Sequence, residues 1–290
     1  MKKVLIALII IVCLVIGFGF FEIYISTHWL KVTRYDIRSE KLQREMKVCL
    51  LADLHDHEFG EGNAKLVEMV MGENPDLIIM CGDFLNVDSA DASVPVTLIP
   101  QLTAIAPVYF TWGNQEMDYM KAHQDLPEQL ENAGAIILEE DMADLEINGN
   151  RICLAGMYDY AFALEGHGNL DKTQMDPKLL DFLETYQRKD AFKLMSAHRP
   201  DSFVFGQAVE TWDIDLVLSG HIHGGQVILP FVGGLYGADL GFFPEYDFGE
   251  YHFPAVKNMI ITTGLGSDKE KLPRFNNVPE IVMIDLKPAE

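Results

Sequence analysis

The sequence predicts a layered α/β domain preceded by an N-terminal membrane anchor. Two observations indicate the domain. Strand-like apolar runs alternate with stretches of helical spacing from Lys47 onward, and several of these runs end in Asp, Asn or His. Such alternation is typical of α/β layering. A third observation indicates the anchor, because the chain begins with a long uncharged apolar run. We therefore expect residues 1–30 to form the anchor with its juxtamembrane segment and residues 31–290 to form the folded domain.

The anchor is predicted from the run between Val4 and Phe21, which follows Lys2 and Lys3. Its length approaches the roughly 20 apolar residues needed to span a bilayer, and residues 23–25 can extend it. A cleaved signal has a shorter apolar core and ends at an A-x-A-like site, which is not found here. The run therefore favours an uncleaved, single-pass anchor in the cell membrane over a removed signal.

The orientation of the anchor depends on the basic residues that flank it. Lys2 and Lys3 favour a cytoplasmic N-terminus, whereas three basic residues behind the span oppose it: Lys31, Arg34 and Arg38. We expect the folded domain to be extracytoplasmic.

Charge and cysteine content exclude two classes of function. The formal net charge of -22 argues against a nucleic-acid partner, because contacts to phosphate need clustered Lys and Arg. A small phosphorylated substrate remains compatible with this acidity, since bound divalent cations reverse the local field. The four cysteines are scattered without a C-x-x-C motif, so we expect buried thiols and no zinc ribbon.

The elements of the domain follow from apolar patterning. Strands are expected at 48–52, 77–81, 108–112, 192–197, 216–218, 227–229, 259–263 and 281–284. Helices are expected at 63–72, at 94–105 with an interruption at Pro100, and within 115–132, with Gly134 as a stop signal. Residues 145–154 predict a hairpin that turns at Asn148-Gly149-Asn150. Residues 230–256 are rich in Gly, Phe, Tyr and Pro and predict a surface excursion that shapes a substrate entrance.

Polar side chains follow five of the predicted strands. They are Asp53 and His55, then Asp83, Asn114 and His198, and last His221 and His223 within Gly220-His221-Ile222-His223-Gly224-Gly225. Residues two apart in an extended chain share a face, and binding sites in layered α/β sheets lie beyond the carboxyl ends of strands. Singly, each residue is typical of a turn or a helix cap. Together, seven oxygen and nitrogen ligands exceed what one tetrahedral zinc needs and suit a pair of metal ions.

This order of motifs resembles the calcineurin-like, binuclear metallophosphoesterases. Their pattern is D-x-H, G-D, G-N-H-[DE], a lone His and G-H-x-H, and it matches this chain from about Lys47 to the end. The run Gly-His-Ile-His-Gly-Gly-Gln also resembles the membrane-associated or exported bacterial branch. The resemblance implies a core of two sheets packed as a β-sandwich and flanked by helices.

The resemblance also implies roles for the seven residues. One ion would be held by Asp53, His55 and His223, the other by Asn114, His198 and His221, and Asp83 would bridge them. Two ions about 3.5–4 Å apart can share a hydroxide and clamp a phosphoryl group for in-line attack. The expected activity is metal-dependent hydrolysis of a phosphomonoester or phosphodiester, with manganese, iron or zinc as the cofactor.

The chain departs from the family pattern at one catalytic position. Gln115 stands where the family has a His that is credited with helping the leaving group, next to Asn114. Glutamine can donate a hydrogen bond but cannot deliver a proton near neutral pH. We therefore expect weak activity on poor leaving groups. His57 and His123 are the nearest histidines in sequence that could compensate, although both also fit exposed loop or helix positions.

Two arginines are candidates for binding phosphate oxygens. Arg199 follows His198, and Arg274 precedes the last strand. Each also fits a structural role.

Two other functions stay open. An attenuated metal-binding protein that recognises a phosphorylated ligand is favoured only by Gln115, whereas the intact ligand positions favour an enzyme. A lipid-linked pyrophosphate hydrolase would suit an anchored site. The expected partners are a phosphorylated small molecule or lipid head group, and the membrane.

Overall fold

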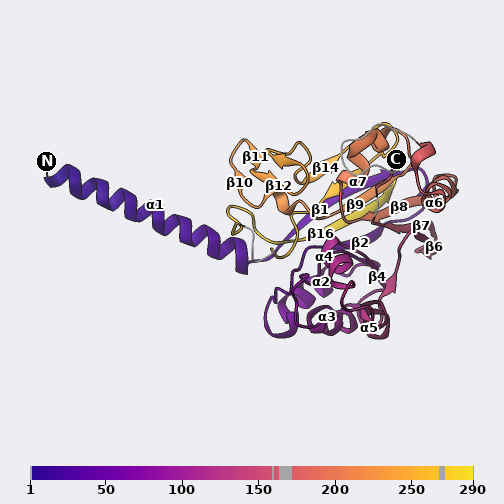
Figure 1. Cartoon of the computed structure of the whole chain (residues 1–290), viewed down its shortest axis with the longest axis horizontal. Helices are drawn as coiled ribbons and strands as arrows, with labels where there is room; N and C mark the ends of the chain where they lie inside the picture. The colour runs from indigo at the N-terminus through magenta and orange to yellow at the C-terminus, as the bar shows by residue number, and fades with distance from the viewer. Residues whose placement is uncertain (1, 159, 163–171, 268–271, 290) are drawn as a thin grey trace.

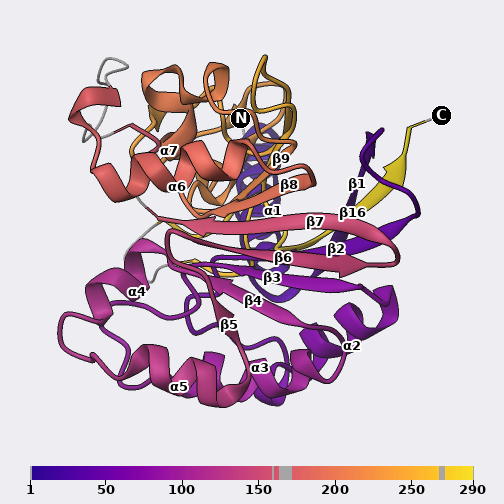
Figure 2. The same ribbon diagram turned by 90° about the vertical axis from the view of Figure 1, so that its right-hand side faces the viewer.

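The apolar runs form two six-stranded sheets in a computed structural model that describes residues 2–158, 160–162, 172–267 and 272–289. Figures 1 and 2 show the sheets stacked on each other with helices on both outer faces. Alternate residues of β2 explain the layers. Val48 and Leu50 pack between the sheets, whereas Cys49 and Leu51 pack under the helices. Strands buried on both faces read as continuous apolar runs. The predicted two-sheet sandwich flanked by helices is confirmed.

The first sheet has the strand order β1-β16-β2-β3-β4-β5. Strands β2 to β5 are parallel, β16 is antiparallel to β2, and β1 is parallel to β16. The strands are β1 (Lys31–Ser39), β2 (Met46–Leu51), β3 (Leu77–Cys81), β4 (Val108–Thr111), β5 (Ile136–Ile137) and β16 (Glu280–Pro288).

The second sheet has the order β14-β15-β9-β8-β7-β6. Its four inner strands are parallel, and the edge strands β14 and β6 are antiparallel to their neighbours. The strands are β6 (Asp141–Ile147), β7 (Asn150–Met157), β8 (Phe192–Ala197), β9 (Leu216–Ser219), β14 (Gly249–Tyr251) and β15 (Met259–Ile261). The predicted hairpin is the β6–β7 pair.

Helices cover the outer face of each sheet. The first sheet carries α2 (Ala64–Glu73), α3 (Ser93–Thr103), α4 (Asn114–Tyr119) and α5 (Leu126–Ala133), and the second carries α6 (Pro177–Gln187) and α7 (Asp201–Val204). Short 3₁₀ turns lie at Glu61–Asn63, Lys172–Gln174, Phe205–Glu210 and His223–Gly225. The interruption predicted at Pro100 is wrong, because α3 continues through it. Burial of Leu98, Ile99 and Leu102 against the sheet outweighs the hydrogen bond that proline cannot make.

Two parts of the fold differ from the predicted pattern. Strand β1 was not predicted, yet it pairs with β16 over its whole length. Its basic residues bind acids of the domain, since Lys31 pairs with Glu280 and Arg34 with Glu73. The strand predicted at 227–229 is β10 (Ile228–Leu229). The excursion contains three more two-residue strands before β14: β11 (Gly233–Gly234), β12 (Tyr236–Gly237) and β13 (Gly241–Phe242).

Helix α1 (Lys2–His28) projects from the domain (Figure 1). In the described part of the chain it is the one helix long and apolar enough to cross a membrane. Its 27 residues correspond to about 40 Å of helix. The last turn contacts the domain, because Ser26 Oγ accepts a hydrogen bond from the Asn277 amide at 3.1 Å. The division between anchor and domain at residue 30 stays a prediction.

Candidate metal centre

Turns from both sheets meet at one edge of the sandwich. The turns after β2, β3 and β4 carry Asp53, His55, Asp83 and Asn114, and those after β8 and β9 carry His198, His221 and His223. All of these side chains are buried except that of Asn114, which is partly exposed. The structure therefore gathers residues that span 171 positions of the sequence, from 53 to 223, into one neighbourhood.

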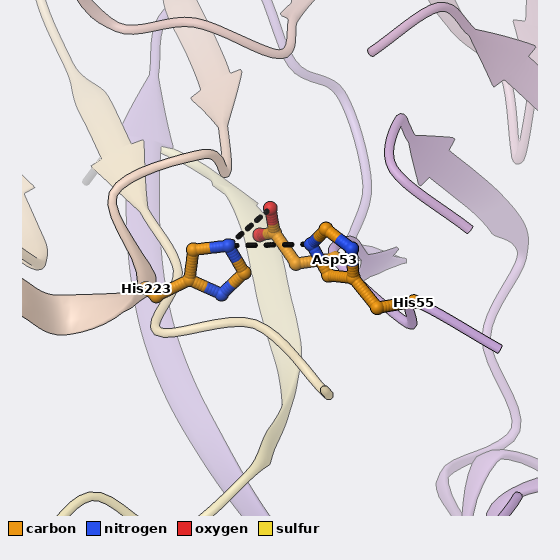
Figure 3. Close-up of side chains that lie close together, drawn as sticks. All are labelled: Asp53, His55 and His223. Atoms are coloured by element: carbon orange, nitrogen blue, oxygen red, sulfur yellow. Dashed lines mark hydrogen bonds and ion pairs between the residues drawn. The ribbon is translucent and has the colours of Figure 1, made fainter. Parts of the chain in front are cut away.

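Three of these residues form the first group. Ligand atoms of Asp53, His55 and His223 lie within 4.8 Å of one another. Figure 3 shows the three side chains converging from opposite sheets. The Nε2 atoms of the two histidines are 3.3 Å apart, and His223 Nε2 lies 3.7 Å from Asp53 Oδ1. One cation between them would separate nitrogens that otherwise crowd each other.

Asp83, His198 and His221 form the second group, again with ligand atoms within 4.8 Å. Asp83 Oδ2 is 3.2 Å from His198 Nε2 and 3.8 Å from His55 Nε2. The Asp83 carboxylate therefore lies between the two groups. Asn114 Oδ1 is buried and has no hydrogen-bond partner among the described residues. A buried acceptor in that state is costly unless something else satisfies it.

The backbone of the centre is strained. Left-handed φ values between 50° and 69° occur at Asp53, His55, Asp83, His221 and His223. Such conformations cost about 1–3 kcal/mol each in non-glycine residues and cluster at functional sites. Backbone hydrogen bonds hold the strained turns, since the Asp53 amide donates to Gly82 O at 2.9 Å and the His55 amide donates to Asp83 O at 3.0 Å.

Two glycines allow the turns to approach each other. A Cβ atom at Gly82 would lie 2.6 Å from His198 Nδ1, and one at Gly220 would lie 2.5 Å from Asp53 Oδ2. Both distances are too short for a side chain. These glycines therefore permit strand ends of different sheets to share one site.

Second partners orient the histidines. His55 Nδ1 lies 2.8 Å from Asn86 Oδ1, and His198 Nδ1 lies 2.7 Å from Cys81 O. Each oxygen favours the imidazole tautomer that is protonated on Nδ1. The lone pair of Nε2 is then free to face the centre. This arrangement is typical of metal-ligating imidazoles.

Glu116 fixes the turns of the first sheet to one another. Its buried carboxylate accepts hydrogen bonds from the amides of Asp83, Phe84 and Gly113 at 2.7–2.9 Å. Burial, with Asp83 nearby, raises the pKa of Glu116 to about 7. Gly113 lies three residues before Glu116, but the Asp83 and Phe84 amides lie 33 and 32 positions away, so the sequence pattern did not reveal that Glu116 joins two turns.

The carboxylates of the centre respond differently to burial. Burial raises the pKa of Asp53. For Asp83 burial acts in the same direction, but the His198 imidazole outweighs it and holds the pKa below its ordinary value. The same pairing with Asp83 overcomes burial at His198 and raises the pKa of that imidazole. These opposite shifts indicate that the Asp83 carboxylate between the two groups is anionic.

Asp239 extends the centre from the surface excursion. Its Oδ2 lies 2.9 Å from His221 Nε2 and 3.0 Å from Arg199 Nη2. Arg199 also binds Asp201 at 2.8 Å and lies over the ring of Tyr160. The structure therefore places Arg199 beside the second group. Sequence reasoning missed Asp239, and its one signal was the predicted role of residues 230–256 at the entrance.

Arg274 has a structural environment. Its buried guanidinium donates to Thr263 O, Gly266 O and Asn277 O at 2.8–3.0 Å, and to Asn277 Oδ1 at 2.9 Å. Burial lowers its pKa to about 10. The loop carbonyls need these donors, so this geometry gives no support to the phosphate-binding role predicted for Arg274.

Gln115 and the two nearby histidines have contacts of their own. The Gln115 side-chain Oε1 accepts a hydrogen bond from the Val87 backbone amide at 2.7 Å. The Gln115 backbone amide donates to Asp83 Oδ1 at 2.8 Å. His57 packs edge-on against Phe59, with ring centroids 4.5 Å apart. His123 stacks on Tyr119 at 4.0 Å. Both histidines lie half-buried outside the helices and strands, and each packs on an aromatic ring.

Comparison with known proteins gives a consistent result. Residues 46–225 match the family described as Calcineurin-like phosphoesterase. A Caenorhabditis elegans protein named as a metallophosphoesterase, F40B5.2, is 32% identical over 77% of this chain, which covers 46% of that protein. The phosphodiesterase YaeI of Escherichia coli K12 is 28% identical, with 93% of each chain covered. The uncharacterised metallophosphoesterase YkuE of Bacillus subtilis 168 is 27% identical over 93% of this chain and 90% of its own.

Proposed function

The chain belongs to the calcineurin-like phosphoesterase family, and from this premise we propose that it hydrolyses phosphoesters at a centre of two divalent ions. The observation that carries the proposal is the pair of ligand groups on either side of Asp83. One ion would be held by Asp53, His55 and His223, the other by Asn114, His198 and His221, and both by Asp83.

The donor set fits such a pair. Asn114 Oδ1 is a buried acceptor whose partner would be the second ion. The Asp83 carboxylate can offer one oxygen to each ion and offset their mutual repulsion. A mixture of carboxylate, amide and imidazole donors suits manganese, iron or zinc.

The chain's residues position the substrate and the ions. When bound, two divalent ions supply an activated water and neutralise charge on the transferring phosphoryl group. The water oxygen loses a proton and bonds to phosphorus, the bond from phosphorus to the leaving oxygen breaks, and that oxygen takes up a proton from solvent. Arg199, which lies beside the second group, can receive a phosphate oxygen. Gln115 can donate a hydrogen bond but no proton, so poor leaving groups should react slowly.

Turnover of activated esters tests this proposal. The full chain, purified in detergent, is assayed with p-nitrophenyl phosphate and bis(p-nitrophenyl) phosphate before and after added Mn²⁺, and its metal content is measured. We expect two ions per chain and metal-dependent turnover, with the faster ester showing whether monoesters or diesters are preferred.

The second candidate function, metal-dependent recognition without turnover, is favoured by Gln115 alone. Two bound ions with no hydrolysis of either ester would favour it and contradict the hydrolase.

Helix α1 supports a further part of the proposal, a single-pass anchor. We propose that the domain lies outside the cytoplasm because Lys2 and Lys3 precede the span. Protease added to intact cells should remove the domain. Protection until the cells are permeabilised would reverse the orientation.

A further inference from the structure

An apolar cavity of about 350 Å³ lies beside the candidate metal centre. Its lining includes His223 and Gln226 and an apolar wall that contains Leu235, Tyr236, Phe242 and Leu272. The volume lies within the range of about 300–1,000 Å³ typical of ligand pockets. Because His223 also belongs to the first ligand group, a molecule in this cavity would lie next to the bound ions.

Gln226 supplies a polar contact within the apolar lining. Its side chain is 6% exposed. Its Oε1 accepts a hydrogen bond from Ser267 Oγ at 3.1 Å, whereas its Nε2 is buried without a hydrogen-bond partner in the described part of the chain. An unsatisfied buried donor is costly. A bound molecule with a hydrogen-bond acceptor near the metal centre would satisfy it.

The surface around the cavity exposes large apolar side chains. Phe231, at the tip between β10 and β11, is fully exposed, and Phe242, Phe243 and Leu272 are each more than half exposed. Figure 1 shows β10, β11 and β12 on the side of the domain from which α1 projects. Exposed apolar side chains that cluster in this way are typical of interaction or membrane surfaces.

One residue joins the cavity to the end of α1. Asn277 donates its backbone amide to Ser26 Oγ at 3.1 Å. Its side-chain Nδ2 donates to His223 O at 2.7 Å and to Gln226 O at 3.1 Å. Through Asn277, the last turn of α1 is therefore connected to the backbone of His223 and Gln226 in the cavity lining. If α1 spans a bilayer, the cavity lies at the bilayer surface.

We propose that this cavity binds the hydrocarbon chain of a phosphorylated membrane lipid whose phosphoester reaches the metal centre. The proposal rests on the proposed phosphoesterase function and names its substrate class. A bilayer that holds α1 presents such a lipid beside Phe231 and Phe242, and the chain can leave the bilayer for an apolar wall without crossing water. The net charge of -22 makes apolar contact, not attraction to anionic head groups, the means of approach.

A series of alkyl p-nitrophenyl phosphates tests the proposal. The full chain is placed in phosphatidylcholine nanodiscs with Mn²⁺, and kcat/KM is measured for the methyl, butyl and octyl esters. Each buried methylene should raise kcat/KM by up to about fourfold until the cavity is filled. Leu235→Trp, which narrows the cavity, should lower the octyl-to-methyl ratio by about tenfold or more. Partition of the octyl ester into the nanodisc affects both proteins equally.

Two further variants keep the result interpretable. Leu272→Trp changes an exposed lining residue and should lower the ratio even if Leu235→Trp fails to fold. Ile136→Trp alters an exposed apolar residue of β5. This residue lies at the edge of the first sheet and outside the cavity lining, so the variant should leave the ratio as in the wild type. Equal ratios in the wild type and both lining variants, with the methyl ester turned over, would overturn the lipid proposal alone.

A binding measurement separates this proposal from the hydrolase. Octyl phosphate should raise the thermal midpoint of the wild type more than methyl phosphate does, and Leu235→Trp should remove the difference. If no ester is hydrolysed but this difference is present, the hydrolase fails and the cavity still binds a phosphorylated chain. If neither turnover nor the difference is found, both proposals fail.

Discussion

The two sheets contribute different chemistry to the candidate metal centre. The turns of the first sheet supply both carboxylates, the amide and one imidazole, whereas those of the second supply imidazoles alone: His198, His221 and His223. Among the seven predicted ligands, both carboxylates thus come from the first sheet. Neither sheet's half of the site holds a complete ligand set, so packing of the sheets and assembly of the centre are the same event.

The two halves also differ in how they are held. Glu116 ties the turns of the first sheet to one another. The second half is held by the first, because the His221 amide donates to Asp53 Oδ1 at 2.9 Å and His198 Nδ1 lies 2.7 Å from Cys81 O. A change in the first half should therefore affect both ions, and a change in the second half should affect one.

The largest effect is expected for Asp83→Asn, which removes the charge between the two groups. Loss of one electrostatic stabiliser typically costs about 10²–10³ in kcat, and Asp83 should exceed this range because both ions depend on it. We expect more than one ion per chain to be lost and kcat for bis(p-nitrophenyl) phosphate to fall by more than about 10³-fold. Metal analysis and steady-state kinetics measure both quantities.

Asp88→Asn is the matched control, since Asp88 is exposed and lies five residues from Asp83. It should retain wild-type metal content and rate. Full metal content in Asp83→Asn would show that this carboxylate does not bridge, and the asymmetry between the halves would be lost.

A smaller effect is expected for His198→Ala in the second half. The first group keeps its own three ligands and Asp83. We therefore expect about one ion per chain to remain and kcat to fall by about 10²–10³-fold. His252→Ala, at an exposed histidine, controls for loss of an imidazole. Loss of both ions in His198→Ala would mean that the two ligand groups do not bind metal separately.

The sequence allowed much of this comparison to be predicted. Apolar runs that end in Asp, Asn or His revealed the strand ends. These signals are local, so a single sequence carries them. The i, i+2 argument assumed an extended chain, but Asp53, His55, His221 and His223 all have left-handed φ values. Asp53 and His55 do share a ligand group, whereas His221 and His223 belong to different groups. The two-sheet arrangement came from the family resemblance, because alternation of strands and helices does not show where one sheet ends and the next begins.

What could not be predicted depends on long-range contacts. Strand β1 is polar at most positions, and it forms a strand because it pairs with β16, about 250 residues later. Glu116, Asp239 and Arg274 take their roles from partners that no local spacing reveals. For Arg274 the sequence left a phosphate-binding role and a structural role open, and the structure surrounds its guanidinium with loop carbonyls.

An intermediate effect is expected for Gln115→His, which restores the family residue at the start of α4 in the first half. General acid help is worth about 10²–10⁴-fold. The gain should stay near the low end on alkyl phosphates, because the Gln115 side chain is anchored to the Val87 amide and a new imidazole must leave that contact. We expect little gain on p-nitrophenyl esters, whose leaving group needs no proton.

The ratio of alkyl to aryl rates measures this effect. Gln115→Asn, which keeps the amide but shortens the side chain, is the control and should not raise the ratio. An unchanged ratio in Gln115→His would show that position 115 carries no acid role.

The smallest effect is expected for Glu280→Gln, which weakens a contact between the sheets. Glu280 lies on β16 of the first sheet, and its Oε1 accepts a hydrogen bond from the Thr263 amide, after β15 of the second, at 2.8 Å. Burial opposes ionisation, but Lys31 and the Thr263 amide more than offset it and hold the pKa of Glu280 below its ordinary value of 4.5. The loss should be about 1–3 kcal/mol, the usual worth of hydrogen bonds to a charged group.

The pH dependence gives this last prediction its sign. A carboxylate whose pKa is lower in the folded protein than in the unfolded chain stabilises the fold. This stabilisation is complete at pH values above the pKa in the unfolded chain, and it is lost as the pH falls through the pKa in the folded protein. The wild type should therefore unfold at a higher temperature than Glu280→Gln at pH 7, and the gap should shrink below pH 4.5. Asp36→Asn is the control. Asp36 on β1 also pairs with a lysine, Lys287 on β16, but its carboxylate is exposed, so the unfolding temperature should change little at either pH. An equal gap at pH 7 and at pH 3.5 would mean that the Glu280 charge does not hold the sheets together, and the link between the two halves would then rest on the turns of the metal centre alone.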